Sequence, residues 1–485
     1  MRPRCFLYEV VLANAVSPAL CDKAAVIDCD SGVEITWREL SAQSERMATA
    51  IVRTNDDKVP SVLLGATYDP VKSFLLMMAA WRVGAMYLPV NPSMRQPEVA
   101  ATLRRLVGEE LLVVADESKA EWLLESARAV SFSEIHATNV SDLVSVTKTT
   151  QDDFQLGLLT SGSTGDPKLI RHSAWNLFRA AEIELKNDPN LAAKRIFNSR
   201  PHFTSGGCNS IWPTVLSGGT MLFSREASQI SRFGKIRDVF NKYRVDLFIV
   251  SPSMLHALLD SDDEIPLTRE AVAMKTYYGG MSLPERVVDV LRARGLDLRM
   301  RYGMTEIAHI VSTVSPSLKT GLMGKPYADI EVMEKDGHLW FRGDGIASSC
   351  RREAGWFKSD DLGSISNEGE ILLHGREQAI VNVNGFRFPL DEPTRALALH
   401  PSVEQVVVLA QKSERLGAEL VAFYRSSKSS ESIELELRKL AQENLSNFKR
   451  PVEYVYVQSW PYTDGGKTDV RALWSLRLSS AKQST

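Results

Sequence analysis

The chain has 485 residues, of which 44% are hydrophobic and 24% are charged. At about 100–200 residues per domain, this length predicts two to four folding units. Lysines and arginines (57) nearly balance aspartates and glutamates (60), leaving a net charge of −3, which gives no electrostatic footprint for nucleic acid or an anionic membrane. The longest apolar run, Phe74–Trp81, is far shorter than the ~20 residues of a spanning helix. A membrane channel, a collagen, a disordered tail and a disulfide-stapled secreted module are therefore excluded.

The five cysteines are widely dispersed and include no CxxC pair. This pattern favours reduced thiols in a cytosolic protein over a disulfide framework or a zinc site. The first twenty residues resemble a signal peptide, but Glu9 interrupts their apolar stretch, and a charge there disfavours a signal. We therefore expect a cytoplasmic protein whose partners include neither nucleic acid nor a membrane.

Residues 60–92 predict a strand–helix–strand unit. A short apolar strand over Ser61–Leu64 is followed by Asp69-Pro70, a typical helix start. The helix is expected over Val71–Val83, before Gly84 and a strand over Ala85–Val90. The alternation recurs, with strands expected over 195–199, 246–250 and 276–278 and helices over 208–216, 253–259 and 283–294. Short strands alternating with helices indicate parallel-sheet α/β layers.

The predicted pattern of secondary structure changes after about residue 325, where short strands with glycine turns are expected over 330–334, 338–342 and 371–374. From residue 376 the pattern becomes α+β, with strands over 403–410, 419–424 and 452–458 and a charged amphipathic helix over 431–445. We therefore predict a large multi-layer α/β N-terminal domain over residues 1–375 and a small α+β C-terminal domain over residues 376–485.

A loop rich in hydroxyl residues and glycine, Thr160–Lys168, follows a short apolar strand. Glycines allow close backbone approach, so that successive N–H groups can converge on phosphate oxygens, and the lysine adds a mobile positive charge. The alternative is a flexible surface linker, as Gly/Ser-rich segments often are. The preceding strand and the following Pro-Lys favour a phosphate cradle.

Other nucleotide and nucleophile motifs are missing. Gly466-Lys467-Thr468 mimics the end of a Walker loop, but Pro461 occupies the required first glycine position. No GxSxG nucleophile elbow and no GxGxxG after a strand occurs, so esterase and dinucleotide-binding interpretations lose their main support.

Thr160–Lys168 resembles the TSGSTGxPK signature of the adenylate-forming (ANL) superfamily, which includes acyl-CoA and aryl-CoA synthetases, luciferases and peptide-synthetase adenylation domains. Further segments match the family's motifs in order: Ile35–Leu40, Trp81–Asn91, Tyr278–Gly280, Tyr302–Glu306 (YGxTE), Gly355–Gly363 (GWxxTGDLG), Gly375-Arg376 with Gly385–Arg387, and Pro461–Lys467 with Arg471–Leu473. The chain is therefore identified as a member of this superfamily.

The resemblance implies a ligase that forms carbon–sulfur bonds through an acyl-adenylate. A carboxylate attacks the α-phosphate of ATP and expels pyrophosphate, and the acyl group then passes to the thiol of coenzyme A or of carrier-protein phosphopantetheine. Such catalysis is mostly positioning and electrostatic stabilisation. The resemblance also implies that the small domain is mobile and rotates between the two half-reactions.

The resemblance also implies the ATP site. The departing phosphates would be held by Thr160, Ser161, Gly162, Ser163, Thr164 and Gly165, with Lys168 as a catalytic residue. Gly279 and Gly280 would flank the adenine and Tyr302 would stack on it, although strand-end packing is the ordinary role of such a tyrosine.

Four further residues complete the implied site. Asp361 would bind the ribose hydroxyls, although an aspartate before Leu-Gly is also a common turn former, and Arg376 would contact ribose or phosphate. Thr305 would donate to the α-phosphate. Glu306 would be the ligand of Mg²⁺, which commonly takes only one or two protein carboxylates.

Lys467 is the implied catalytic lysine, inserted between the substrate carboxylate and the α-phosphate, where a compact cation neutralises both. On its own, a lysine on a Gly-Gly turn would be a solvated surface charge. Three positions depart from the family pattern, namely Asp360, Gln378 and Asn382. They leave the implied phosphate and metal ligands intact and bear on the domain rotation, in which the loop of Gly385 would line the pantetheine tunnel.

The segment expected to face the acid, 201–208, contains no acidic residue to pair with an α-amine. A buried, unpaired ammonium would be costly, so the substrate is expected to be an aryl or acyl acid without an α-amine. The residues expected in the acid pocket are His202, Phe203, Ser205, Cys208 and Tyr277. For His202, a satisfied core histidine is an equal alternative.

The acceptor is expected to be free-standing, because only fourteen residues follow Arg471. Coenzyme A is favoured over a separate carrier protein, and Lys449-Arg450 and Arg351-Arg352 are candidates for binding its phosphates. Two alternatives remain: a stand-alone adenylation enzyme that loads a carrier protein with an amino acid or acyl group, and a catalytically lapsed nucleotide-binding homologue.

Overall fold

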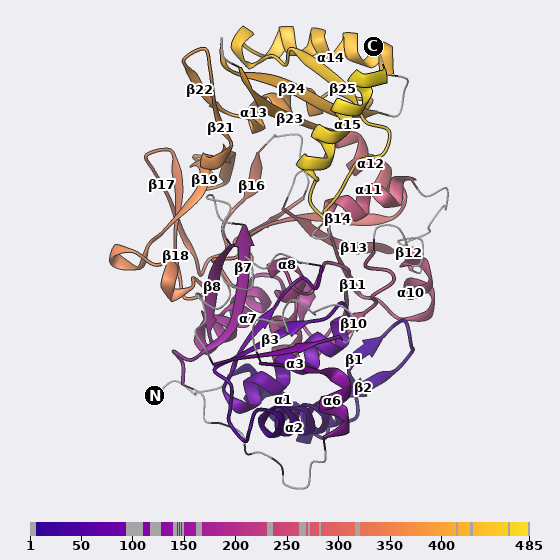
Figure 1. The fold of residues 1–485 in the computed structure, drawn as a ribbon, viewed down its shortest axis with the longest axis vertical. Coiled ribbons are helices and arrows are strands. Elements are labelled where there is room, and N and C mark those ends of the chain that lie inside the picture. Colours follow the sequence, from indigo (N-terminus) through magenta and orange to yellow (C-terminus); the bar gives the residue numbers. More distant parts are fainter. Residues whose placement is uncertain are drawn as a thin grey trace.

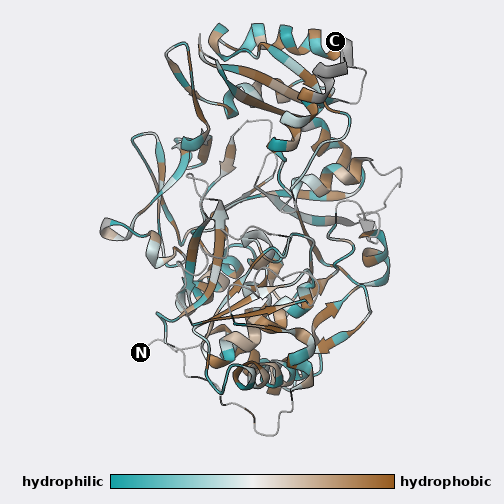
Figure 2. Cartoon of the chain, in the orientation of Figure 1, coloured by the Kyte–Doolittle hydropathy of each residue, from teal (hydrophilic) through white to brown (hydrophobic). Residues whose placement is uncertain are grey.

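The computed structural model describes residues 6–93, 110–116, 128–138, 143, 145, 147, 150–161, 167–229, 236–260, 268–269, 272–280, 283–315, 321–413, 416–426, 430–463 and 466–483. Figure 1 shows a large N-terminal α/β part and a smaller C-terminal part that caps one end of it. This arrangement confirms the predicted fold class. Hydrophobic residues concentrate in the strands and inner helices of both parts (Figure 2).

The first sheet of the large part has six strands in the order β6-β5-β3-β4-β7-β8. Its strands are β3 (Val62–Ala66), β4 (Met86–Pro89), β5 (Leu111–Ala115), β6 (Arg128–Ser131), β7 (Phe154–Ser161) and β8 (Pro167–Ser173). All neighbours are parallel except the β7–β8 hairpin. Helices α1 (Leu7–Val16), α2 (Trp37–Thr54), α3 (Pro70–Val83), α6 (Phe132–Ala137) and α7 (Ala174–Asn187) occur in the same region of the chain.

The second sheet has nine strands, with the path β15-β14-β13-β11-β9-β10-β1-β2 and β12 beside β13. The strands are β1 (Ala24–Asp28), β2 (Glu34–Thr36), β9 (Arg195–Asn198), β10 (Thr220–Phe223), β11 (Leu247–Val250), β12 (Thr268–Arg269), β13 (Val272–Gly279), β14 (Leu296–Tyr302) and β15 (Ser312–Val314). The helices in this stretch are α8 (Ser205–Cys208), α9 (Ile211–Ser217), α10 (Ile236–Lys242), α11 (Pro252–Asp260) and α12 (Glu285–Ala293). Strands β14, β13, β11, β9, β10 and β1 are mutually parallel, as predicted.

A five-stranded antiparallel sheet, β16-β20-β19-β18-β17, follows. It contains β16 (Leu322–Gly324), β17 (Glu331–Lys335), β18 (His338–Arg342), β19 (Phe357–Ile365) and β20 (Ile371–Arg376). The C-terminal part contains β21 (Ile380–Val383), β22 (Phe386–Pro389), β23 (Val403–Ser413), β24 (Gly417–Ser426) and β25 (Glu453–Tyr456), with helices α13 (Asp391–Ala398), α14 (Ser430–Asn444) and α15 (Val470–Gln483).

Local sequence signals explain the first βαβ unit. The side chain of Asp69 accepts hydrogen bonds from the backbone of Val71 and Lys72 at the start of α3, and Pro70 occupies the first helical position. Gly84 ends the helix in the left-handed conformation, with φ of 81°. The interior of α3 is buried on nearly all sides, because the helix lies inside the large core.

The predicted helix over 208–216 is instead two short helices, α8 and α9. Pro213 lacks the N–H that would continue a helix back to Asn209. The amide of Asn198 donates to the carbonyls of Gly206 and Gly207 and to the Ser210 hydroxyl, which holds the break in place. Both short helices therefore lie close to the end of β9.

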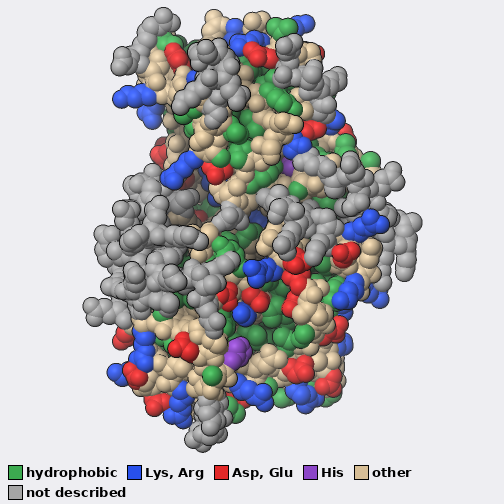
Figure 3. Space-filling view, turned by 45° about the vertical axis from the view of Figure 1, so that its right-hand side comes forward, with side chains coloured by type: hydrophobic (Ala, Val, Ile, Leu, Met, Phe, Trp, Pro, Cys, Tyr) green, Lys and Arg blue, Asp and Glu red, His purple; other side chains and the backbone are tan. Residues whose placement is uncertain are grey.

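No described helix has the length and apolar character required to span a membrane. Lysine and arginine side chains are interspersed with aspartate and glutamate over the face shown in Figure 3, consistent with the nearly balanced charge.

Candidate active site

The candidate site lies where four neighbouring parallel strands end. β9, β11, β13 and β14 run in the same direction, so their carboxyl ends share one edge of the sheet, the usual place for ligands in open α/β sheets. Beyond these ends come Arg200, Ser251, Gly280 and the segment from Gly303 to Glu306. Sequence motifs far apart in the chain are thereby brought to one edge.

A buried tyrosine, an aspartate and an arginine form one hydrogen-bonded group. The hydroxyl of Tyr302 donates to Asp361 Oδ2 at 2.6 Å, and Arg376 Nε donates to Asp361 Oδ1 at 3.1 Å. Asp361 and Arg376 lie opposite each other on β19 and β20. Burial, together with the Asp361 carboxylate, raises the pKa of Tyr302 well above its usual value, so the phenol remains a donor.

Two of the departures from the family pattern contact each other. The amide of Gln378 donates to Asp360 Oδ2 at 2.6 Å. The extra carboxylate beside Asp361 is therefore partnered by the uncharged residue at the hinge. The third departure, Asn382, accepts a hydrogen bond from the backbone N–H of Gly385 at 2.9 Å.

The Thr305–Glu306 segment is fixed by backbone contacts on both sides. His172 Nε2 donates to the carbonyl of Thr305 at 2.8 Å, and Ala347 N donates to the carbonyl of Glu306 at 2.9 Å. The hydroxyl of Thr305 donates to Ser205 Oγ at 3.3 Å. Burial raises the pKa of the Glu306 carboxyl, and the neighbouring Asp360 carboxylate adds to the effect.

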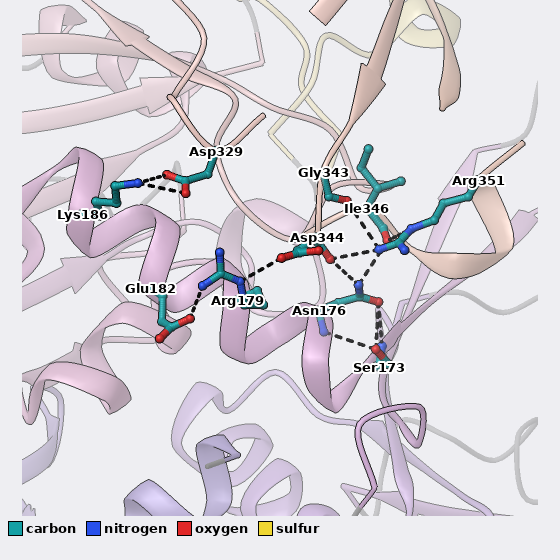
Figure 4. A network of polar contacts seen from close by, with 10 residues as sticks. All are labelled: Ser173, Asn176, Arg179, Glu182, Lys186, Asp329, Gly343, Asp344, Ile346 and Arg351. Atoms are coloured by element: carbon teal, nitrogen blue, oxygen red, sulfur yellow. Dashed lines mark hydrogen bonds and ion pairs between the residues drawn. The ribbon is translucent and has the colours of Figure 1, made fainter. Parts of the chain in front are cut away.

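Helix α7 holds the loop that supports Glu306. The amide of Asn176 donates to the carbonyls of Asp344 and Ile346 at 2.6 and 3.1 Å, and Arg179 Nε donates to Asp344 Oδ2 at 3.1 Å. Arg351, at the end of the same loop, also donates to these two carbonyls. Figure 4 shows these side chains converging on the 343–351 loop. The loop is thus held by side chains of α7 and by its own Arg351.

The predicted phosphate loop connects β7 to β8. Thr160 lies opposite Lys168 in this hairpin, and Gly162, Ser163, Thr164 and Gly165, together with the side chain of Ser161, lie outside the described residues. Lys168 is exposed. The pKa of Cys350 is raised mainly by burial, and it is also raised by Glu306 and lowered by Lys168, so both charges lie near this thiol.

Lys467 reaches the same edge from the C-terminal part. It follows Gly466, which has a φ of 74° and packs so closely on Ser251 and Ser253 that a Cβ would lie 2.9 Å from Ser253 Oγ. Burial lowers the pKa of Lys467, and the positive charges of Arg376 and Arg200 lower it further. No described residue forms a hydrogen bond or ion pair with its ammonium group.

A cavity of about 70 Å³ opens beside the strand ends. Of the predicted acid-pocket residues, Ser205 and Tyr277 line it, and the Tyr277 hydroxyl is bonded to Asp188. His202, Phe203 and Cys208 are not among its lining residues. Instead His202 Nε2 donates to the Thr67 carbonyl at 3.0 Å, and the Cys208 thiol donates to the His202 carbonyl at 3.0 Å.

The sequence motifs did not point to several residues that line the cavity. These are His172, Arg200, Trp212, Arg301 and His309. They come from β8, α9, β14 and two loops, so only the fold brings them together. The direct signal for Arg200 was its position just before the segment expected to face the acid.

Three of the four basic residues predicted for coenzyme A, Lys449, Arg450 and Arg351, have side-chain partners within the protein. Lys449 forms an ion pair with Glu392 at 2.5 Å, and Arg450 donates to the carbonyls of Leu445 and Gln442. Arg351 is engaged in the 343–351 loop. These groups therefore have structural roles as well as charge.

Comparison with known proteins identifies the relatives of this chain. A family model described as AMP-binding enzyme matches residues 14–349, and one described as AMP-binding enzyme C-terminal domain matches residues 395–467. Bacitracin synthase 2 of Bacillus licheniformis is 22% identical over 93% of this chain, which spans only 18% of that much longer protein. The 2-succinylbenzoate–CoA ligase of Listeria monocytogenes is 25% identical over 90% of this chain and 93% of its own length.

Solved structures share the whole fold. The o-succinylbenzoate CoA synthetase of Bacillus subtilis, in complex with its acyl-adenylate intermediate, superposes with a TM-score of 0.81 at 20% identity, covering 96% of this chain and 97% of the other. An anthranilate CoA ligase in complex with anthranoyl-AMP gives 0.82 at 18% identity, covering 98% of each chain.

Proposed function

Because the chain belongs to the AMP-binding enzyme family of the adenylate-forming superfamily, we propose that it is an AMP-forming acid–thiol ligase. The observation that carries this proposal is the position of Lys467. Gly466 packs against Ser251 and Ser253 at the end of β11, which brings Lys467 to the strand ends, near the positive charges of Arg376 and Arg200. The proposed domains are residues 1–375, which hold ATP and the acid, and residues 376–485, which supply Lys467.

The first half-reaction is adenylation. A carboxylate oxygen of the acid attacks the α-phosphorus of ATP, a new P–O bond forms, and the bond to the bridging oxygen breaks to release pyrophosphate. Lys467 would neutralise both the carboxylate and the α-phosphate, so that negative charge developing on the phosphorus oxygens is stabilised. Thr305 would donate to the α-phosphate, while Lys168 and the loop from Thr160 to Gly165 would hold the pyrophosphate.

The nucleoside would be held by the strand ends and by the group around Asp361. Gly279 and Gly280 would flank the adenine, beside Tyr302. Arg376 and Tyr302 fix the Asp361 carboxylate, which could then accept both ribose hydroxyls. Because each Asp361 oxygen already has one donor, the carboxylate is held in a single orientation for the ribose.

Glu306 fits the role of a Mg²⁺ ligand. Burial and the nearby Asp360 disfavour its ionised form, and a bound divalent cation would relieve both effects. The remaining ligands would be phosphate oxygens and water, because Mg²⁺ commonly takes only one or two protein carboxylates. When bound, Mg²⁺ supplies charge neutralisation of the ATP phosphates.

The acid is proposed to lack an α-amine. Among the residues that the structure describes, no aspartate or glutamate lines the cavity, whereas Arg200 and Arg301 do. An ammonium group would be buried there without a partner and beside like charges, which is costly. Aryl or acyl acids fit this lining, and the relatives named as aryl acid ligases support the choice.

In the second half-reaction a thiolate attacks the acyl carbon. A C–S bond forms, the C–O bond to AMP breaks, and AMP leaves. We favour coenzyme A as the thiol and a free-standing carrier protein as the alternative, because both CoA ligases and a peptide synthase occur among the relatives. The dispersed cysteines support reduced thiols and a cytoplasmic location.

The test is carboxylate-dependent ATP–pyrophosphate exchange with Mg²⁺, using benzoates, salicylates, cinnamates, short to medium fatty acids and dicarboxylates, with α-amino acids as controls. Exchange with one or more of the acids that lack an amine supports the proposal. Exchange with α-amino acids alone would overturn the choice of acid, and ADP formation in place of AMP would overturn the reaction.

A further inference from the structure

Arg200 is a positively charged side chain just beyond the end of β9, in the wall of the candidate cavity. It lines the cavity together with Gly280 and Thr305, which are proposed to contact the adenine and the α-phosphate. The side chain is partly buried. Burial lowers the pKa of its guanidinium to about 10, and the like charge of Arg301 adds to this effect. Arg200 therefore carries a positive charge at neutral pH, close to the place where the two substrates are proposed to meet.

The position of this guanidinium is set by the surrounding backbone. Asn198 Oδ1 accepts a hydrogen bond from the backbone N–H of Arg200 at 3.0 Å, and the Asn198 amide donates to the carbonyl of Gly206 at 3.1 Å. A Cβ on Gly206 would lie only 2.1 Å from Arg200 Cζ, closer than any non-bonded contact. The guanidinium can therefore rest against α8 only because residue 206 is glycine.

The Arg200 side chain is available to bind an anion. In the described part of the chain, no residue accepts a hydrogen bond from its guanidinium or forms an ion pair with it. Arg301, the other arginine that lines the cavity, is by contrast paired with Glu184, which also accepts from the backbone N–H of Ile310. Of the two arginines, Arg200 is thus the one whose guanidinium is free to meet a substrate.

The anion that Arg200 faces belongs to the reacting end of the substrates. The hydroxyl of Thr305 donates to Ser205 Oγ at 3.3 Å, and Ser205 adjoins Gly206, on which the guanidinium rests. The charge of Arg200 also acts on Lys467. Adenylation brings a carboxylate next to the α-phosphate, so two negative charges must approach each other, and a cation beside each of them lowers the cost.

The carboxylate is the better match for Arg200. Thr305 and Lys467 are the proposed partners of the α-phosphate, whereas Lys467 alone has been assigned to the carboxylate. The planar guanidinium fork can bind both oxygens of a carboxylate at once. Arg200 also belongs to the large part of the protein, while Lys467 comes from the small part. Arg200 can therefore hold the acid whether or not Lys467 has reached the site.

We propose that Arg200 binds the reacting carboxylate of the acid and holds it beside the α-phosphate for Lys467. This inference rests on the proposed ligase function and assigns a further residue of the same site to the acid. Arg200 would govern the affinity for the acid, and Lys467 would govern the rate of adenylation.

The test compares the acid that gives the fastest exchange with its own carboxamide, for example benzoate with benzamide. Each is titrated by calorimetry into the full chain saturated with Mg²⁺ and α,β-methylene-ATP, which cannot release pyrophosphate. The wild type is expected to bind the acid more tightly than the amide. In Arg200→Met the affinity for the acid should fall by about 10- to 100-fold, the loss typical of hydrogen bonds to a charged group, so that the preference disappears. The affinity for the nucleotide should not change.

Three further variants separate a role in binding from a structural one. Arg200→Lys retains the charge without the planar fork, so its affinity for the acid should be intermediate. Lys467→Ala should bind the acid within a few-fold of the wild type although its exchange activity is lost. Arg299→Met is the matched control, because Arg299 is an arginine of β14 that is paired with Asp297, and it should bind the acid and the amide as the wild type does.

Unchanged affinity for the acid in both Arg200 variants would overturn the inference. Equal loss for the acid and the amide would also overturn it, since the change would then act through the shape of the pocket. A loss of nucleotide affinity alone would assign Arg200 to the α-phosphate instead. Failure of the ligase proposal is distinct, because no acid would then support exchange in the wild type.

Discussion

Tyr302 and Asp361 belong to different sheets, yet the tyrosine hydroxyl donates to the aspartate at 2.6 Å. Tyr302 ends β14 of the nine-stranded sheet, and Asp361 lies in β19 of the five-stranded sheet. The bond therefore joins the two sheets at the place where the nucleoside is proposed to bind. Arg376 completes the group from β20.

Removing the charge of Asp361 should weaken ATP binding. Asp361→Asn breaks the ion pair with Arg376 and leaves one oxygen to accept from ribose, so we expect a loss of about 10- to 100-fold in ATP affinity, measured by calorimetry. Tyr302→Phe is the matched control, because it retains the ring and removes only the hydroxyl, and it should cost a few-fold. Wild-type affinity in both variants would contradict the proposed ribose site.

Lys467 should be needed for one half-reaction only. In Lys467→Ala, pyrophosphate exchange should fall by about 1,000-fold or more, since a positioned charge in the transition state is lost, while ATP binding persists. Thioester formation from a preformed acyl-adenylate should be largely retained, because the rotation of the small domain that the family resemblance implies would carry Lys467 away before that step. Equal loss in both half-reactions would indicate a structural role or the lack of a rotation.

Three histidines, the buried His172 and His309 and the partly buried His202, should make the fold sensitive to acid. Burial lowers the pKa of His172, His202 and His309 to about 4, from about 6.5 in an unfolded chain. Between these values the unfolded state binds more protons, so stability falls as the pH drops below about 6.5, by on the order of 1–2 kcal/mol per histidine at pH 5.

The measurement is the thermal midpoint between pH 7 and pH 5 for the wild type and for His202→Gln, which retains a donor for the Thr67 carbonyl. The variant should lose less stability on acidification than the wild type. Parallel pH profiles for the two proteins would show that His202 titrates normally in the folded state. Carboxyl groups that titrate in the same pH range affect the stability of both proteins equally, so their effect cancels when the two pH profiles are compared.

The clamp on the 343–351 loop should contribute to both stability and activity. Asn176→Ala removes two hydrogen bonds to the carbonyls of Asp344 and Ile346, which keep Arg351 as a donor, at a cost of about 0.5–1.5 kcal/mol per bond, and should lower the thermal midpoint and the exchange rate together. Lys186→Ala, on the same helix, removes an exposed ion pair with Asp329 and should cost less than about 1 kcal/mol. Equal effects of the two changes would contradict the clamp.

The linear order of the chain predicted the elements well where local signals are strong. Asp69-Pro70 and Gly84 bound α3 because capping and glycine chirality act within a few residues. The sequence predicts one helix over 208–216. The break in this helix depends on hydrogen bonds from Asn198, which lies in the earlier strand β9, so local sequence signals do not reveal it. The final helix, α15, was not predicted, because its sequence lacks a clear apolar period.

Motif residues could be recognised from the sequence, but the lining of the cavity could not. Arg200 and His309 lie outside the recognised motifs, and they face the same cavity only because β9 and β14 end at one edge of the sheet. The contact between Asp360 and Gln378 similarly escaped prediction, since the two departures lie on different segments. Such contacts depend on the register between strands, which cannot be predicted from the local sequence.

The central claim is that the acid is activated as an acyl-adenylate, and isotope transfer tests it most directly. An acid labelled with ¹⁸O in its carboxylate is incubated with ATP, Mg²⁺ and the thiol, and the nucleotide product is analysed by mass spectrometry. One ¹⁸O atom should appear in AMP, because the oxygen that attacks the α-phosphorus remains there when the thiol displaces AMP. Unlabelled AMP, or ADP with ¹⁸O in inorganic phosphate, would contradict the account.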